Sequence, residues 1–204
     1  MIIGVDFDNT IVCYDEVFHR VASEKGLIPD GLPARKNAVR DYLRDQGQER
    51  EWTELQGSVY GARMAEAQPF PGVRDFFVRG REQGIPLYII SHKTPKAVVG
   101  PAYDLHQAAR DWLDSQGFFD RTGLGLPPEH VYFGVTRQEK VGLIRQTGCT
   151  HFVDDLEETF LEESFPANVS KILFGRSEAL QQLPDARPAR DWRRVTEYVF
   201  GADQ

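Results

Sequence analysis

Short apolar runs alternate with longer helix-like segments over most of this chain. The first run, at residues 2–5, is typical of a strand that a parallel sheet buries on both faces. Similar runs return at residues 86–90, 131–135, 151–153 and 171–174. The helices predicted among them are residues 73–83, 137–146, 156–164 and a last helix that begins near Trp192. This rhythm predicts an α/β fold, a Rossmann-like doubly wound parallel sheet with helices on both faces.

The alternation of strands and helices is interrupted after the first run, because residues 14–68 contain no convincing strand. Apolar residues at helical spacing predict three helices there, over residues 14–25, 34–46 and 51–67. The chain returns to strand–helix alternation at about residue 69. We therefore predict an α/β core, residues 1–13 and 69–204, with a helical insert at residues 14–68. A long polar and partly helical crossover within the core is expected to end near residue 116.

Composition and charge narrow the class of protein. Of the 204 residues 41% are hydrophobic, which is enough for a core, and the net charge of −7 argues against broad nucleic-acid binding. The two cysteines, Cys13 and Cys149, are too few for a disulfide framework. The chain has neither the pattern of a signal peptide nor an apolar run long enough to span a membrane. We therefore expect a cytoplasmic protein that does not bind membranes.

Two carboxylates follow the first strand. Asp6 and Asp8 are two positions apart, so an extended chain directs them to the same side. Open parallel sheets bind ligands at the carboxyl ends of their strands. Carboxylates this close repel each other unless a proton or a cation lies between them. Oxygen ligands of this kind suit Mg²⁺, which is the cofactor that we predict.

Other polar residues come at equivalent places along the chain. Ser91 ends the second predicted core strand, Lys140 begins a helix after the third, and Asp154 and Asp155 end the fourth. All of these side chains are expected to meet at one edge of the sheet. Acids, a hydroxyl, a lysine and a metal are the groups that phosphoryl transfer needs.

The order and spacing of these motifs resemble those of the haloacid dehalogenase (HAD) superfamily, in its phosphatase branch. The resemblance covers residues 1 to about 175. The matching stretches are Asp-Phe-Asp-Asn-Thr at 6–10, Ile-Ser at 90–91, Lys140 with the apolar residues after it, Val-Asp-Asp at 153–155, and Phe-Pro-Gly-Val at 70–73.

The resemblance implies a role for each acid of the first motif. Asp6 would be the nucleophile that forms an aspartyl-phosphate, and it would also bind Mg²⁺. Asp8 would protonate the leaving alcohol, later activate water, and lend its backbone carbonyl to the metal. An acid at this second position favours a phosphatase over a dehalogenase, because an alkoxide leaving group needs a proton and a halide does not.

The remaining motifs imply the rest of the site. Ser91 would donate a hydrogen bond to a phosphoryl oxygen, and Lys140 would pair with both the nucleophile and the phosphate. Asp155 would be the main remaining Mg²⁺ ligand, with Asp154 beside it.

The helical insert resembles the C1 cap of the family, a lid that would exclude water and select the leaving group. A small lid favours a small phosphorylated metabolite as substrate, and the sequence indicates no oligomeric state. The residues predicted to bind that substrate are Gln56, Tyr60 and Arg63 in the cap, together with His92 and Lys93 directly after Ser91.

Several alternatives stay open at this stage. An Asp after a strand is often only a helix cap, although four such features in order make that interpretation a poor one. A two-component receiver domain uses similar residues, but there the lysine comes last. The same fold also serves phosphate-binding or scaffold proteins, phosphotransferases, and phosphonate hydrolases that use a cap lysine. The lysines of the predicted cap are Lys25 and Lys36, and the sequence around neither of them indicates that role.

Overall fold

The computed structural model describes residues 1–175, 183 and 185–201. The remaining residues of the predicted core, 176–182, 184 and 202–204, lie outside the described residues. The chain divides into two compact units. We call Met1–Val12, Pro69–Lys93 and Gly117–Gln204 the core unit, and Cys13–Gln68 with Thr94–Gln116 the helical unit.

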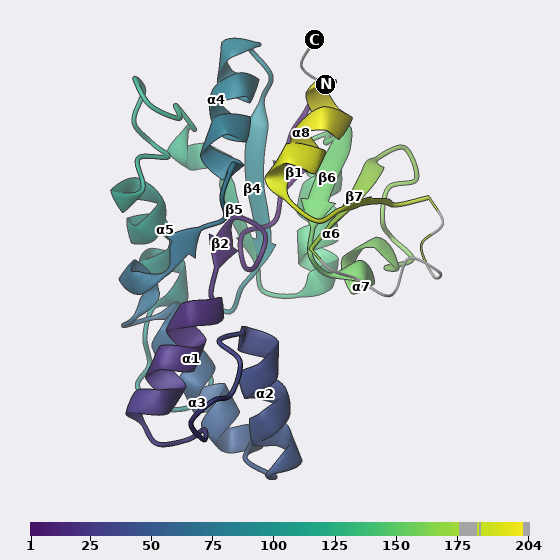
Figure 1. Cartoon of the computed structure of the whole chain (residues 1–204). Coiled ribbons are helices and arrows are strands. Elements are labelled where there is room, and N and C mark those ends of the chain that lie inside the picture. Colours follow the sequence, from purple (N-terminus) through teal and green to yellow (C-terminus); the bar gives the residue numbers. More distant parts are fainter. Residues whose placement is uncertain (176–182, 184, 202–204) are drawn as a thin grey trace. The chain divides into compact units, whose positions relative to one another are not determined.

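The core unit is built on a parallel sheet, as the sequence predicts, and this sheet has six strands (Figure 1). Its strands, in spatial order, are β5 (Val131–Gly134), β4 (Leu87–His92), β1 (Ile3–Val5), β6 (His151–Asp154), β7 (Ser170–Phe174) and β8 (Arg187–Ala189). The first strand of the chain is therefore central, with β4 on one side and β6 on the other. This order brings the carboxyl ends of three motif-bearing strands together.

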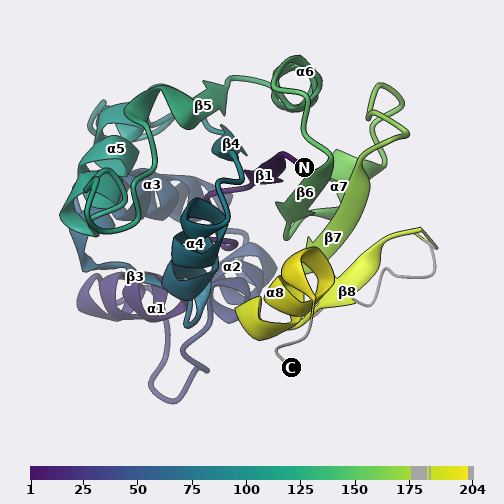
Figure 2. The ribbon, with the colours of Figure 1, turned by 90° about the horizontal axis from the view of Figure 1, so that it is seen from above.

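Helices cover both faces of the sheet (Figure 2). One face carries α4 (Val73–Glu82) and α8 (Trp192–Phe200), and the other carries α6 (Arg137–Gln146). On the first face Phe76 packs against Trp192, with ring centroids 4.9 Å apart. On the α6 face the core includes Val141, Ile144 and Phe152. Both helical layers are thus anchored by side chains that water does not reach, which fixes α6 against the sheet.

The core unit differs from the sequence prediction in two elements. The helix expected over residues 156–164 is much shorter, α7 (Glu157–Phe160), because Phe160 and Phe165 turn into the same cluster with ring centroids 5.3 Å apart. Strand β8 was not predicted, since it contains Pro188. It is the edge strand of the sheet, where a missing backbone N–H is tolerated. The unit also contains a short 3₁₀ helix, η2 (Pro128–His130).

The helical unit contains a helix in each of the three segments predicted for the insert, but the third ends at Tyr60 and not at residue 67, because the chain turns at Gly61 into a separate 3₁₀ turn. The three helices are α1 (Asp15–Glu24), α2 (Lys36–Asp45) and α3 (Glu49–Tyr60), followed by the 3₁₀ turn η1 (Met64–Glu66). Buried side chains at helical spacing, such as Val17, Val21 and Leu55, form its interior. The unit also includes α5 (Leu105–Ser115), which the sequence assigned to the core. The two-stranded sheet of β2 (Val12–Cys13) and β3 (Gln68–Pro69) completes the elements.

Among the residues that the structure describes, we find no helix with the length and apolar character needed to cross a bilayer.

Candidate functional site

The ends of the central strands bring the predicted residues together within the core unit. Asp6 follows β1, Ser91 lies near the end of β4, and Asp154 ends β6. The Oγ of Ser91 donates to Oδ1 of Asp6 at 2.9 Å. The backbone N–H of Asp6 donates to the carbonyl of Val153 at 2.9 Å, which continues the ladder between β1 and β6 past the end of β1. Parallel pairing therefore sets the position of Asp6.

Lys140 joins the carboxylates of two strands. Its Nζ lies 2.7 Å from Oδ1 of Asp6 and 2.6 Å from Oδ2 of Asp154, and all three side chains are buried. Burial by itself would lower the pKa of Lys140, but Asp154 and Asp6 raise it above its ordinary value. The lysine is thus held as a cation between two acids. Its position near the start of α6 follows from the cap at Thr136, whose side chain accepts from the N–H of Glu139.

Asp6 is only 4% exposed, and its surroundings change its protonation. Burial is the largest influence and raises the pKa of Asp6 from 3.8 to about 6, with further increases from Asp154 and Asp8 and an opposing decrease from Lys140. At neutral pH the group is still the carboxylate. Negative charge at this position is nevertheless costly without a cation.

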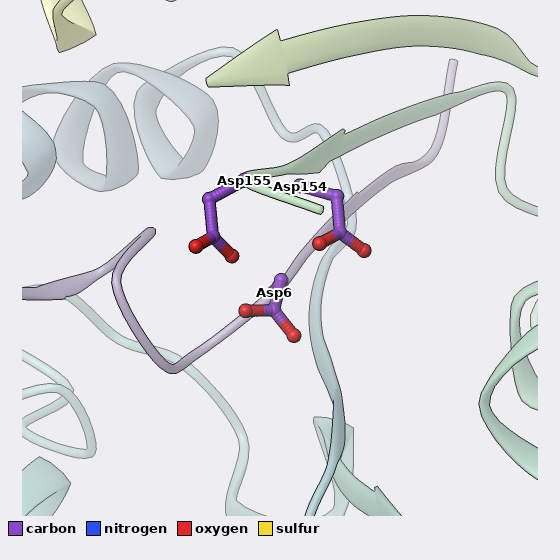
Figure 3. A group of neighbouring side chains, drawn as sticks. All are labelled: Asp6, Asp154 and Asp155. Carbon is purple, nitrogen blue, oxygen red and sulfur yellow. The ribbon is translucent and has the colours of Figure 1, made fainter. Parts of the chain in front are cut away.

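Three carboxylates form a cluster that suits a metal ion. Oxygen atoms of Asp6, Asp154 and Asp155 all lie within 4.8 Å of one another, and Figure 3 shows the three carboxyl groups beside each other. Clustered carboxylate oxygens are the ligands that a hard divalent cation such as Mg²⁺ prefers. The predicted ligand set therefore fits this cation for these three residues. The contribution predicted for the backbone carbonyl of Asp8 stays a prediction.

The carboxyl group of Asp8 has a different neighbour. Nζ of Lys93 donates to both of its oxygens, at 3.0 Å to Oδ1 and 2.8 Å to Oδ2. Lys93 is 3% exposed, whereas Asp8 is half-buried. The sequence predicts that Lys93 contacts the substrate. In the structure its ammonium binds Asp8, the residue predicted to act as the general acid and base.

The other residues predicted to bind substrate have different neighbours. His92 is exposed, with its Nε2 3.0 Å from the carbonyl oxygen of Val135. In the helical unit Gln56 is half-buried on α3, and Tyr60 packs edge-on against Tyr14 with ring centroids 4.9 Å apart. Arg63 forms ion pairs with Glu24 and Glu66 in the same unit. The roles of these four residues toward a substrate stay predictions.

Thr10 is a site residue to which the sequence analysis gave no role. It is fully buried, and its hydroxyl lies 3.4 Å from Oδ2 of Asp6 and 3.5 Å from Oδ1 of Asp155. The backbone reverses at Asn9, whose φ of 57° is left-handed, and this turn brings Thr10 back toward Asp6. The sequence contains a feature that could have indicated this residue: Thr10 is polar, lies four positions after Asp6 and directly precedes two apolar residues.

The sheet order can be compared with that of solved structures. The chain has the fold of the HAD-superfamily hydrolases, a Rossmann-like core with a parallel sheet. No protein-family model matches the chain, and no curated protein matches its sequence.

Three solved structures illustrate the similarity. A HAD family hydrolase from Deinococcus radiodurans R1, with bound phosphate and sodium, has a TM-score of 0.63 and 16% identity over 97% of this chain and 94% of that one. A HAD-superfamily hydrolase from Ehrlichia chaffeensis has a TM-score of 0.57 and 13% identity, covering 98% and 95%. A HAD phosphatase from Thermococcus onnurineus has a TM-score of 0.51 and 15% identity, covering 98% of each chain. At these identities the similarity establishes the fold.

Proposed function

We propose that this protein is a Mg²⁺-dependent phosphatase that hydrolyses a small phosphate monoester through an aspartyl-phosphate on Asp6. The observation that carries the proposal is the contact of Lys140 with Asp6 at 2.7 Å beside the carboxylates of Asp154 and Asp155. A nucleophilic carboxylate, a fixed cation and a metal-binding cluster are thereby combined at one strand end. The phosphate bound to the Deinococcus structure supports an anion of this kind for the same fold.

The hydrogen bonds of Asp6 support its role as the nucleophile. Its Oδ1 accepts from Ser91 and Lys140, so the plane of the carboxylate is fixed by two donors. We assign the attack on phosphorus to Oδ2. A bond forms between Oδ2 and phosphorus while the ester P–O bond breaks. The third N–H of Lys140, and the hydroxyl of Ser91 once it turns away from Asp6, would donate to the charge that develops on the phosphoryl oxygens.

Asp8 supplies the proton transfers. In the first step it gives a proton to the leaving oxygen, so that the product departs as an alcohol. In the second step it accepts a proton from the water that attacks phosphorus, which releases inorganic phosphate and restores Asp6. General acid–base catalysis of this kind is worth roughly 10²–10⁴-fold in rate.

Asp6, Asp154 and Asp155 would hold the metal. While Asp8 is ionised, the four acids Asp6, Asp8, Asp154 and Asp155 outnumber the two lysines of the site by two charges, and a divalent ion would balance this excess. When bound, Mg²⁺ would neutralise charge on the transferring phosphoryl group.

The substrate that we propose is a small phosphorylated metabolite. The helical unit would act as the lid that selects its leaving group, as the C1 cap does in the family that the sequence resembles. Gln56, Tyr60, Arg63 and His92 are the candidate contacts in this proposal. The net charge of −7 still argues against nucleic acid as a partner.

Turnover of p-nitrophenyl phosphate with Mg²⁺ tests the proposal, and a panel of phosphorylated metabolites extends the test to the substrate. We expect phosphate release that EDTA abolishes and that Asp6→Asn reduces to background. A chain that binds phosphate but releases none from any ester would instead be a phosphate-binding or scaffold protein. Release that is unchanged in Asp6→Asn would exclude Asp6 as the nucleophile.

A further inference from the structure

Lys93 is held in place by the core unit on several sides. Its backbone N–H donates to the carbonyl of Gly134 at 2.9 Å, which extends the ladder between β4 and β5 by one residue. Its ammonium lies 5.5 Å from the centroid of the buried Phe7 ring. With the side chain 2% exposed, few rotamers are available to it. The contact with Asp8 is therefore made by a lysine that has little freedom to move.

We propose that Lys93 is a positioning residue that sets the orientation of Asp8 for proton transfer. This inference rests on the proposed phosphatase function and assigns Lys93 a role toward Asp8 in place of direct contact with the substrate. Because Nζ donates to both carboxylate oxygens, it restrains the rotation of that carboxyl group as well as its position.

The pattern along β4 supports this division of roles. Ser91 and Lys93 are buried while His92 between them is exposed, as expected from the alternation of side chains in a strand. The same side of the strand thus presents a hydroxyl to Asp6 and an ammonium to Asp8. One strand supports both acids of the first motif.

Orientation matters because Asp8 must reach the leaving oxygen along the line of the breaking bond. A carboxyl group that rotates freely spends less time in the productive geometry, and small misplacements reduce rates strongly. The loss should be greatest for esters whose leaving group most needs a proton. A residue that binds the phosphoryl group directly would affect all esters equally.

The experiment measures kcat/KM for a series of aryl phosphates whose leaving phenols differ in acidity: 2,4-dinitrophenyl, p-nitrophenyl and phenyl phosphate. The variants are Lys93→Met, Asp8→Asn and the double variant. The matched control is Lys171→Met, which removes a Lys–Asp contact of 2.8 Å to Asp185 near the start of β7, at the opposite end of a parallel strand. Thermal unfolding checks that each variant is folded, and Lys93→Gln replaces Lys93→Met if the latter is not.

We expect Lys93→Met to lower kcat/KM for phenyl phosphate by roughly 10–100-fold, within the range of acid–base catalysis, and to lower it for the dinitrophenyl ester only a few-fold. In Asp8→Asn, too, kcat/KM should fall more for phenyl phosphate than for the dinitrophenyl ester. The double variant should be no slower than Asp8→Asn, because the effects of substituting two residues that act together do not add. Lys171→Met should match the wild type.

Equal losses across the series that multiply with those of Asp8→Asn would overturn the proposal and make Lys93 a phosphate ligand. The proposal would also be overturned if kcat/KM of Lys93→Met depended on the acidity of the leaving phenol as it does in the wild type. If that dependence became steeper in Asp8→Asn alone, Lys93 would have no such role but the phosphatase function would still hold. No turnover of any ester by the wild type would reject the phosphatase function and this role of Lys93 with it.

Discussion

The ammonium of Lys140 lies 2.7 Å from the carboxylate of Asp6, across 134 positions of sequence, and both residues are buried. The lysine comes from α6, which packs on one face of the sheet, and the acid comes from the end of β1. The contact therefore depends on the docking of α6 against the sheet as well as on the strand order. A change in either would separate the two groups.

Lys140→Met is expected to destabilise the protein strongly. The substitution leaves Asp6 and Asp154 buried without their shared cation, and breaking a buried ion pair in this way costs about 3–5 kcal/mol. Lys171→Met is a matched control, because its partner Asp185 is 63% exposed and such pairs contribute about 0–1 kcal/mol. Urea unfolding at pH 7 measures both values. Equal losses in the two variants would show that Lys140 is not needed to compensate the buried acids.

The protonation of Asp6 predicts a pH-dependent stability in metal-free buffer. Its pKa is raised from 3.8 to about 6 in the folded protein, chiefly by burial. Between these values the folded state binds more protons than the unfolded state, so this group lowers the free energy of unfolding as pH rises through the window. For a pKa shift of roughly two units, the contribution of Asp6 to the free energy of unfolding changes by about 3 kcal/mol over the whole window.

Asp6→Asn removes this titration and isolates its contribution. The unfolding free energy of the variant minus that of the wild type should increase by up to about 3 kcal/mol between pH 4 and pH 7, measured by urea unfolding in EDTA. Comparing differences at two pH values cancels any constant cost of the substitution. A difference that does not change with pH would mean that Asp6 keeps its ordinary pKa in the fold.

The acids and the serine of the motifs could be placed from the sequence because each of them ends or directly follows a short apolar run, whereas Lys140 lies in the helix after such a run. The strands that precede Asp6 and Asp154, and the parallel sheet that joins them, are confirmed. The sequence assigned α5 to the core, whereas the structure groups it with the helical unit. Its amphipathic pattern shows that one face is buried, but not against which partner, and in the structure Trp112 of α5 donates to the carbonyl of Ala67 in the helical unit.

The contact between Asp8 and Lys93 could not be predicted from spacing along the chain, since it joins residues 85 positions apart. A local signal nevertheless distinguished Lys93 from His92. Residues two apart on a strand share a side, so the burial of Ser91 implies that of Lys93 and the exposure of His92. The turn at Asn9 could not be predicted from the alternation of side chains, because it depends on the left-handed backbone angle of that one residue.

Asp154 and Asp155 are expected to respond differently to amide substitution. Both oxygens of Asp154 accept hydrogen bonds from the protein, from Lys140 and from the backbone N–H of Leu156, and the residue is fully buried. Asp155 is half-buried at the edge of the cluster. Asp154→Asn should therefore reduce stability by about 2–4 kcal/mol, whereas Asp155→Asn should fold normally and bind Mg²⁺ weakly.

Thermal unfolding with and without Mg²⁺ separates these effects. In the wild type, Mg²⁺ at 100 times its dissociation constant should add about 2.7 kcal/mol of stability, and the shift should be almost absent in Asp155→Asn. Ca²⁺, which is larger and prefers more ligands, serves as a second probe of the same cluster. A full Mg²⁺ shift in Asp155→Asn would remove this residue from the metal site.

The last helix of the described chain supports the loop after β1. The indole Nε1 of Trp192 donates to the carbonyl of Thr10 at 3.0 Å, and the hydroxyl of Thr10 faces Asp6 and Asp155. Trp192→Phe keeps most of the ring but leaves a buried carbonyl without this donor. We expect a loss of about 1–3 kcal/mol in unfolding free energy and a weaker affinity for Mg²⁺ in a titration of the folded protein.

Trp112→Phe provides the comparison that makes this test specific. Trp112 is also buried, and its Nε1 donates to a backbone carbonyl at 2.9 Å, but it lies in the helical unit. The chemical change is the same, so both variants should lose similar stability, while only Trp192→Phe should weaken Mg²⁺ binding. If both variants bind Mg²⁺ as tightly as the wild type, the bond from Trp192 stabilises the fold without shaping the acidic cluster. If both bind it equally weakly, the effect on the metal is a general result of lower stability.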